Sequence, residues 1–387
     1  MKQLCVVTGT RAEYGLLKPL ICAILEDAQL QLTLVVTGMH LCPEFGLTYQ
    51  EIVADGFTID EKIEILLSSD TTRGMTKSVG LAMLSFAEYF ERKRPDMLVV
   101  LGDRYEIFAC ATAAAMAFIP IAHLYGGDTT EGAVDEFLRH SITKMSYLHF
   151  VSTDVSKKRV EQLGESPDRV FNYGALGVEN ILSVPLLSKP MLEKSIEFEL
   201  NRNYALVTFH PVTMENESAH EQFGQLLTAL DRFADLKFIF TKANSDANGR
   251  IINAMIDDYV ESRSNCVAFT SMGMLRYLSA MKYASLVIGN SSSGLYETPS
   301  FHIPTINIGD RQRGRLQASS IINCSPVCDD IACAIERGLS PEWVNIAKQT
   351  VSPFGSGNTS KRIVAKIEEF LLDDKIDMKK KFYDLEV

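Results

Sequence analysis

Short apolar runs alternate with longer segments of helical periodicity along nearly all of the 387 residues, and this alternation limits the possible folds more than any other feature. Apolar runs bounded by glycine or polar residues predict strands, and the amphipathic segments between them predict helices. Strands that alternate with helices form parallel sheets covered on both faces. The predicted strands are 4–8, 32–37, 97–101, 119–124, 148–152 and 170–173 in the first half, and 204–209, 236–241, 266–270, 286–288 and 305–308 in the second.

The strand series pauses once, over residues 183–203, which hold two prolines and many charges. We interpret this pause as the connection between two domains of similar build, 1–184 and 185–358. Segment 359–387 is expected to pack back on the first domain, with its lysine-rich part, 375–381, as a solvated end. The predicted fold class is therefore α/β, with two Rossmann-like, doubly wound parallel-sheet domains. Ligands bind at the carboxyl ends of such strands, so two facing domains would form an interdomain cleft.

Composition excludes several classes of partner. The formal net charge of −11 argues against nucleic acid and against a membrane surface. No apolar run reaches membrane-spanning length, and the chain enters its first strand without a signal peptide, so a cytoplasmic location is expected. The eight cysteines include no CxxC pair and no matching histidine set, which predicts that no metal is bound.

A stretch in the second half, residues 285–315, has the pattern of a phosphate site. An apolar strand breaks into Gly289, Asn290 and three serines, Ser291, Ser292 and Ser293, and turns into a helix that carries Glu297. Small residues and exposed N–H groups at such a turn suit phosphates, and Glu297 could accept from ribose hydroxyls. The next strand ends in a loop with three arginines, among them Arg311 and Arg313, which suit a charged leaving group. The alternative is an ordinary serine-rich turn followed by a solvated basic loop.

Polar residues also follow the first three strands. Arg11 and His40 come after the first and second strands, and Asp103 and Arg104 come directly after the third. The carboxyl ends of parallel strands meet at one edge of a sheet, so these side chains are candidates for ligand contacts. The alternatives are a surface ion pair for Arg11, a structural role for His40 and a helix N-cap for Asp103.

The fourth predicted strand leads into a Gly-Gly turn followed by a cluster of carboxylates. Asp128, Glu131 and Asp135 are the candidates for an acid or base in this segment. Spacing offers a simpler reading for part of it, because 135 with 139 and 136 with 140 are helix neighbours that could form ion pairs. We expect at least one of the carboxylates, but not all of them, to serve catalysis.

Two further candidates belong to the second domain. His210 ends its first strand and precedes a proline, which holds the backbone extended. Asn244 follows the next strand and could contact the edge of a ligand. His210 is expected to face Asp103 across the cleft.

Taken together, these segments resemble the hydrolysing branch of the UDP-N-acetylglucosamine 2-epimerase family. The resemblance runs almost end to end and rests on the order and spacing of GTRAEYG, TGMHL, LGDRYE, HLYGGDTTEGAVDEFLRHSITKMS, TFHPVT, GNSSSGLYE and INIGDRQRGR. It implies the GT-B fold, with UDP held mainly by the second domain. It also implies roles for Ser291, Ser292 and Arg311 on the diphosphate, Glu297 on the ribose, Asn244 near the uridine, Arg11, Arg104 and His210 on the phosphates or sugar, and Asp103 in catalysis.

The resemblance further implies a reaction. Cleavage of C1–O gives the sugar oxocarbenium character and acidifies C2–H, a carboxylate removes that proton to leave a 2-acetamidoglucal, and water then adds with C2 inverted. UDP-N-acetylglucosamine would give N-acetylmannosamine and UDP, with no cofactor, and a homodimer is common in the family. Three alternatives stay open: a UDP- or GDP-linked 2,4-diacetamido-trideoxy sugar as substrate, a GT-B glycosyltransferase, and a sensor without turnover. Residues 125 and 128 differ from some relatives, so the base at C2 is also open.

Overall fold

The computed structural model describes residues 1–67, 72–129, 134–201, 203–210, 218–242, 249–270, 272–373 and 376–385. The chain forms two compact units, one of residues 1–180 with 354–387 and the other of residues 181–353. The domain limits predicted from the sequence, at 184 and 358, lie close to the points where the chain passes from one unit to the other, after residues 180 and 353.

The first unit is built on a parallel sheet that, within the described residues, has seven strands in the order β3-β2-β1-β4-β5-β6-β7. Its strands are β1 (Lys2–Thr8), β2 (Leu30–Thr37), β3 (Glu61–Ile63), β4 (Met97–Leu101), β5 (Ile121–Leu124), β6 (Leu148–Val151) and β7 (Val170–Asn172). The order reverses between β1 and β4, which is the switch point of a doubly wound sheet.

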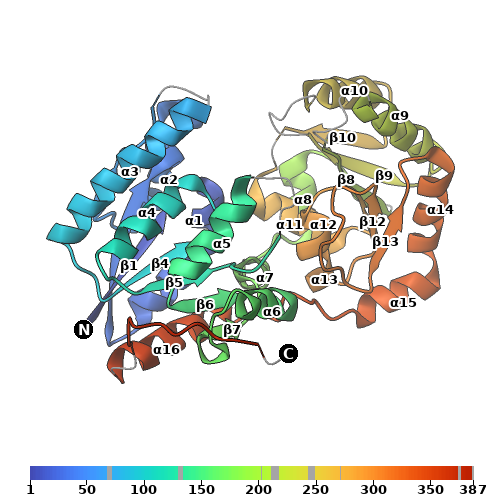
Figure 1. Cartoon of the computed structure of the whole chain (residues 1–387). Helices are drawn as coiled ribbons and strands as arrows, with labels where there is room; N and C mark the ends of the chain where they lie inside the picture. The colour runs from blue at the N-terminus through green and yellow to red at the C-terminus, as the bar shows by residue number, and fades with distance from the viewer. Residues whose placement is uncertain are drawn as a thin grey trace. The chain divides into compact units, whose positions relative to one another are not determined.

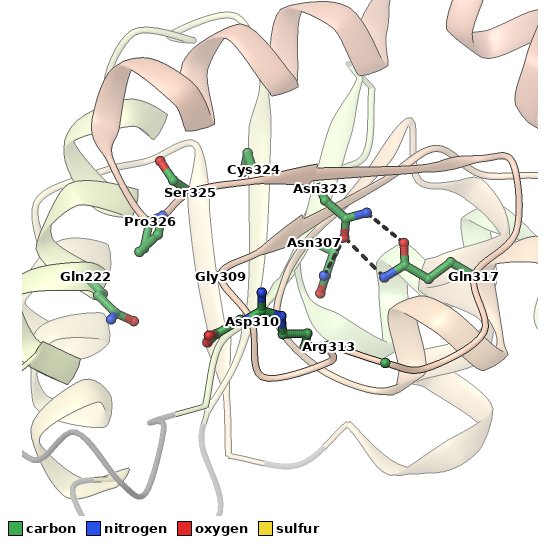
Figure 2. Close-up of a pocket in the computed structure, with 11 residues that line it drawn as sticks. Gln222, Asn307, Gly309, Asp310, Arg313, Gln317, Asn323, Cys324, Ser325 and Pro326 are labelled. Atoms are coloured by element: carbon green, nitrogen blue, oxygen red, sulfur yellow. Dashed lines mark hydrogen bonds between the residues drawn. The ribbon is translucent and has the colours of Figure 1, made fainter. Parts of the chain in front are cut away.

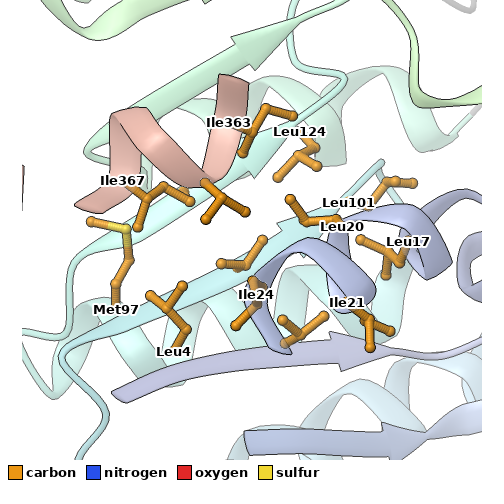
Figure 3. Packing of buried hydrophobic residues seen from close by; sticks show 14 of the residues in the cluster. Leu4, Leu17, Leu20, Ile21, Ile24, Met97, Leu101, Leu124, Ile363 and Ile367 are labelled. Carbon is orange, nitrogen blue, oxygen red and sulfur yellow. The ribbon is translucent and has the colours of Figure 1, made fainter. Parts of the chain in front are cut away.

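Helices cover both faces of this sheet, as Figure 1 shows. They are α1 (Arg11–Glu26), α2 (Tyr49–Ala54), α3 (Thr72–Arg92), α4 (Tyr105–Met116), α5 (Val134–Met145), α6 (Asp154–Gln162), α7 (Leu176–Ser183) and α16 (Thr359–Leu372), with short 3₁₀ turns η1 (Gly38–Leu41), η2 (Pro43–Phe45) and η3 (Pro167–Arg169). Successive residues of a strand point to opposite faces. In β1, Leu4 and Val6 therefore pack with α1 and α16 (Figure 3), whereas Cys5 and Val7 pack with α3, α4 and α5.

The second unit repeats the plan on a sheet with six strands among the described residues, in the order β10-β9-β8-β11-β12-β13, again all parallel. The strands are β8 (Tyr204–Thr208), β9 (Lys237–Thr241), β10 (Cys266–Phe269), β11 (Leu286–Gly289), β12 (Thr305–Ile308) and β13 (Ile321–Cys324). Its helices are α8 (Lys189–Ile196), α9 (Ser218–Leu230), α10 (Gly249–Glu261), α11 (Gly273–Tyr283), α12 (Ser293–Tyr296), α13 (Thr298–Phe301), α14 (Cys328–Leu339) and α15 (Pro341–Gln349). Ala205 and Val207 face α9, α10 and α14, and Tyr204 and Leu206 face α8 and α11.

The predicted fold class is confirmed for both doubly wound sheets, whereas the cleft between them stays a prediction. Two edge strands, β3 and β13, were not predicted. Each is short, with three and four residues, and β3 is EKI, so neither shows a long apolar run. No described helix is long and apolar enough to cross a membrane. The cytoplasmic location stays a prediction.

The expectation of a solvated tail is wrong for Lys380. Its Nζ donates to the buried carboxylate of Glu165 at 2.9 Å and to the carbonyl oxygen of Ser146 at 2.6 Å. Two residues on, Phe382 lies against Gly164, where an added Cβ would come within 2.3 Å of its ring. The segment after α16 is therefore held on the first unit by side chains that its charged composition did not indicate.

Candidate active site

The candidate residues gather at the carboxyl edges of the two sheets, beside the switch points. In the first unit these are the turns after β1 and β4, and in the second the turns after β8 and β11. At a switch point the loops of neighbouring strands leave in opposite directions and open a crevice for a ligand.

In the second unit, Gly289 lets β11 approach β8 closely. Its φ is 141°, and a Cβ there would lie 1.8 Å from the carbonyl oxygen of Thr208. The next residue, Asn290, joins the same two strand ends: its Oδ1 accepts from the backbone N–H of His210 and its Nδ2 donates to the carbonyl oxygen of His210, both at 2.7 Å. The two turns are thus fixed to each other by one buried amide.

The serines and Glu297 follow directly. Ser293 opens α12, and its hydroxyl donates to the Glu297 carboxylate in a very short hydrogen bond. The hydroxyl oxygen of Tyr277, in α11, lies 2.7 Å from the hydroxyl oxygen of Ser293. Burial raises the pKa of Glu297 to about 7, and the bond from Ser293 opposes that rise. Ser291 and Ser292 lie in the preceding turn and are partly exposed, as phosphate contacts require.

The basic loop after β12 is anchored on this turn and is not simply solvated. Arg311 Nη1 and Gln312 Nε2 donate to the carbonyl oxygen of Asn290 at 3.0 Å and 2.8 Å. Gln312 is buried, whereas Arg311 is exposed. The guanidinium of Arg311 is therefore held beside the serine turn.

Arg313 lines a neighbouring cavity of about 600 Å³ at the carboxyl ends of β12 and β13 (Figure 2). Asn307 Nδ2 donates to Asn323 Oδ1 at 2.8 Å, and Asn323 and Gln317 exchange amide hydrogen bonds on the wall of this cavity. Asn307 also lines the smaller space behind the serine turn, so the cavity adjoins the candidate phosphate site.

In the first unit, Arg139 contacts carboxylates from the segments that follow β4 and β5. Its side chain is 5% exposed, and it forms an ion pair with Asp103 through Nη2 and another with Glu136 at 3.2 Å. Its Nη1 also donates to the carbonyl oxygen of Asp128 at 2.8 Å. The predicted pair of Glu136 with His140 is present at 3.1 Å, but Glu136 shares its carboxylate with Arg139.

Asp135 and Asp128 differ in surroundings. Burial and the nearby charge of Asp103 raise the pKa of Asp135, against the pull of Arg104 and Arg139. Asp128 instead accepts a hydrogen bond at 2.5 Å from Ser156 of α6. Asp135 is thus the stronger acid–base candidate of the two. Glu131 and Asn244 lie outside the described residues.

The remaining candidates fall into two groups. His40 is buried, with its ring nitrogens 3.0 Å from Thr8 Oγ1 and 2.8 Å from Thr48 Oγ1, and burial lowers its pKa to about 4. It is a neutral residue that joins the β1 and β2 turns. Arg11 and Arg104 reach the surface: Arg11 pairs with Glu51 at 3.0 Å, and Arg104 with the buried Glu106 at 2.7 Å.

Sequence reasoning did not select four residues that the structure places here, namely Glu13, Glu106, Arg139 and Tyr277. Glu13 and Glu106 are buried carboxyl groups beneath the β1 and β4 turns. A signal was available for Glu13, since Thr10 with Glu13 is a capping box, and it pointed only to a helix start. Among the described residues, no group of three or more metal-ligating side chains is close enough to hold a metal ion.

The chain is similar to known proteins along most of its length. The family model described as UDP-N-acetylglucosamine 2-epimerase matches residues 23–368. A Campylobacter jejuni protein named GDP/UDP-N,N'-diacetylbacillosamine 2-epimerase (hydrolyzing) is 45% identical over 343 residues, 88% of each chain. The polysialic acid biosynthesis protein P7 of Escherichia coli is 39% identical and covers 100% of this chain and 98% of its own length.

The fold also matches solved structures. A Neisseria meningitidis UDP-GlcNAc 2-epimerase, solved bound to UDP-GlcNAc, superposes with a TM-score of 0.81 over 95% of this chain and 100% of its own, at 20% identity. The predicted GT-B-like architecture is thereby confirmed.

Proposed function

The chain belongs to the UDP-N-acetylglucosamine 2-epimerase family, and from this premise we propose that it cleaves a nucleotide-linked 2-acetamido sugar and inverts C2. The products are the nucleoside diphosphate and the free epimerised sugar. The hydrolysing course is supported by the name of the Campylobacter relative.

The observation that carries the proposal is the unequal pair Asp103 and Asp135. Asp103 is held by a buried guanidinium, and the pKa of Asp135 is raised by burial and by the charge of Asp103. Two carboxyl groups in such different surroundings can divide the roles of ionic stabiliser and proton carrier. Asp103 would stabilise the oxocarbenium charge, and Asp135 would take the C2 proton from one face of the sugar. During hydration water would add its oxygen at C1, and a solvent-derived proton would reach C2 on the opposite face, as inversion requires.

The second unit supplies the groups for the leaving diphosphate. Negative charge grows on the β-phosphate as C1–O breaks, and Arg311 is fixed beside the serine turn by its bond to Asn290. The hydroxyls of Ser291 and Ser292 and the turn N–H groups would contact the phosphates, while Glu297 would accept from the ribose. Arg11, Arg104 and His210 keep their assignment to the phosphates or sugar, and Arg313 to the UDP end of the site, as part of this proposal.

The relatives favour one sugar over another. Greater identity to the diacetylbacillosamine enzyme points to a 2,4-diacetamido-trideoxy sugar on UDP or GDP, and the matching family model keeps UDP-N-acetylglucosamine as the second candidate. The reaction is the same for both sugars, because it involves only C1, C2 and the 2-acetamido group.

The test is to incubate the purified protein, without acceptor, with UDP-N-acetylglucosamine, UDP-N,N'-diacetylbacillosamine or its GDP analogue in deuterated water. Proton and carbon NMR should show the nucleotide released and a C2-inverted sugar with deuterium at C2. Release that requires an acceptor would establish a glycosyltransferase, and binding without release would establish a sensor. A product that keeps its original C2 hydrogen and configuration would show simple glycoside hydrolysis.

The expected homodimer belongs to the same proposal. Apolar side chains on α3 and α5 are exposed in the single chain, with Leu84 69% and Phe137 60% accessible. Exposed apolar groups of this kind suit an interface between copies. Light scattering during size exclusion should give twice the chain mass of 43.0 kDa.

A further inference from the structure

Two buried carboxyl groups lie on either side of Gly9, where β1 turns into α1. Glu13 is 5% exposed, and its Oε2 accepts from the N–H groups of Gly9 at 2.7 Å and Thr10 at 3.2 Å. Glu106, in the first turn of α4, is 0% exposed and packs on the same glycine, where a Cβ would lie 2.7 Å from its Cγ. Glycine at position 9 is what lets the two acids come together.

Each acid keeps one oxygen without a hydrogen bond to any described residue: Oε1 of Glu13 and Oε2 of Glu106. A buried carboxylate oxygen without a donor is costly, and two such groups near each other repel. One proton on the pair lowers both costs, because it neutralises one of the two acids and removes their mutual repulsion.

Arg104 provides the positive charge that completes the cluster. Its Nε donates to Glu106 Oε1 at 2.7 Å, while its side chain remains 37% exposed at the carboxyl edge of the sheet. Three further groups lie around this cluster: Tyr105 beside Arg104, Cys42 near Tyr105, and the neutral His40, whose backbone N–H donates to the carbonyl oxygen of Gly9. With one proton shared by the two acids, the cluster of Glu13, Glu106 and Arg104 has no net charge.

We propose that Glu13 and Glu106 hold one proton between them and thereby fix Arg104 in position to act on the substrate. The role given to Arg104 rests on the proposed function. Neither acid reaches the surface, so both are positioning residues that act through Arg104. Burial, with the charge of Glu106, raises the pKa of Glu13 to about 8, which agrees with a proton on Glu13 at neutral pH.

The proton gives a test that does not depend on turnover. A carboxyl group with a raised pKa in the folded state favours folding fully below its ordinary pKa near 4.5, and this contribution is lost as the pH rises toward 8. Urea unfolding between pH 5 and 9 should show the unfolding constant rising by up to about tenfold per pH unit from this group. Glu13→Gln should remove that dependence, while Glu26→Gln, exposed on the same helix, should keep it.

Turnover tests the positioning. Glu106→Gln should lower kcat/KM by about 10- to 100-fold, as expected when a charged hydrogen bond is lost. Arg104→Lys keeps the charge but lacks the Nε donor, so it should show a similar loss, and the double variant should lose little more than either alone. The wild-type kcat/KM should fall above about pH 8, and Glu13→Gln should abolish this fall.

Specific outcomes would overturn the proposal. If the unfolding constant depends on pH in the same way in the wild type and in Glu13→Gln, Glu13 does not hold the proposed proton. If Glu106→Gln keeps the wild-type kcat/KM, or if the losses in the double variant are additive, Glu106 does not position Arg104. If the wild type turns over none of the nucleotide sugars, the proposed function fails. UDP affinity by calorimetry then replaces kcat/KM, and an unchanged affinity in Glu106→Gln counts against the positioning in the same way.

Discussion

Asp103 and Arg139 form an ion pair although they lie 36 positions apart in the chain. Asp103 lies in the turn between β4 and α4, and Arg139 is a buried residue in the middle of α5. Because the same guanidinium also binds Glu136 and the backbone of Asp128, it sets where the carboxylates of this edge lie. The chemistry we propose depends on that arrangement.

Replacement of the acids should rank them. Asp103→Asn and Asp135→Asn keep shape but cannot take up a proton or stabilise a cation, so turnover should fall by roughly 10²–10⁴-fold. Asp128→Asn should cost less, since its carboxylate is bound by Ser156. UDP affinity, measured by calorimetry, should survive in all three. A larger loss for Asp128→Asn than for Asp135→Asn would reverse our assignment.

Arg139 should matter for stability as well as for rate. Arg139→Ala leaves two acids without their cation and should lower the free energy of unfolding by about 3 kcal/mol, the lower end for a broken buried pair. Asp103 is 23% exposed, so water offsets part of the cost. Arg232→Ala, which breaks an exposed pair with Asp329, should lower the free energy of unfolding far less in the same urea titration. Equal losses in the two variants would show that Arg139 does not organise the site.

Binding of the ribose should depend on pH through Glu297. The pKa of this carboxyl is raised to about 7, so it gains charge, and strength as an acceptor, as the pH rises through that value. Uridine affinity should therefore increase between pH 6 and 8, and uridine avoids titration of the phosphates. Glu297→Gln should bind uridine with no such dependence. A parallel rise in the variant would assign the effect to another group.

The close approach of β8 and β11 should make Gly289 irreplaceable. Gly289→Ala places a Cβ 1.8 Å from a backbone oxygen, and neither strand can yield without disturbing the sheet. We expect the free energy of unfolding to fall by more than about 4 kcal/mol, a loss that only severe packing or backbone defects cause. Gly273→Ala is the matched control: its φ is 65°, but a Cβ there meets no atom within 4 Å, so only about 1–2 kcal/mol should be lost. Soluble yield and urea midpoints give the comparison.

Much of this protein was readable from the sequence because the information is local. The period of the apolar residues marks strands and helices, and an unbroken alternation of the two requires parallel sheets. The serine turn before Glu297 and the loop with Arg311 were also readable as connections at strand ends, because glycine and serine interrupt an apolar strand. Their role in phosphate binding stays a prediction. Short edge strands escaped this reading, as β3 shows, because three residues carry no period.

The tertiary structure alone decided which side chains meet. Spacing allowed Asp135 to pair with Arg139, yet the order of β4 and β5 in the sheet brings Asp103 to that guanidinium. Likewise, Glu13 and Glu106 lie 93 positions apart and become neighbours because β1 and β4 are adjacent across the switch point. Local pattern fixes which residues are buried and which end of a strand they occupy. Charge pairing and desolvation depend on strand order, which no local pattern encodes.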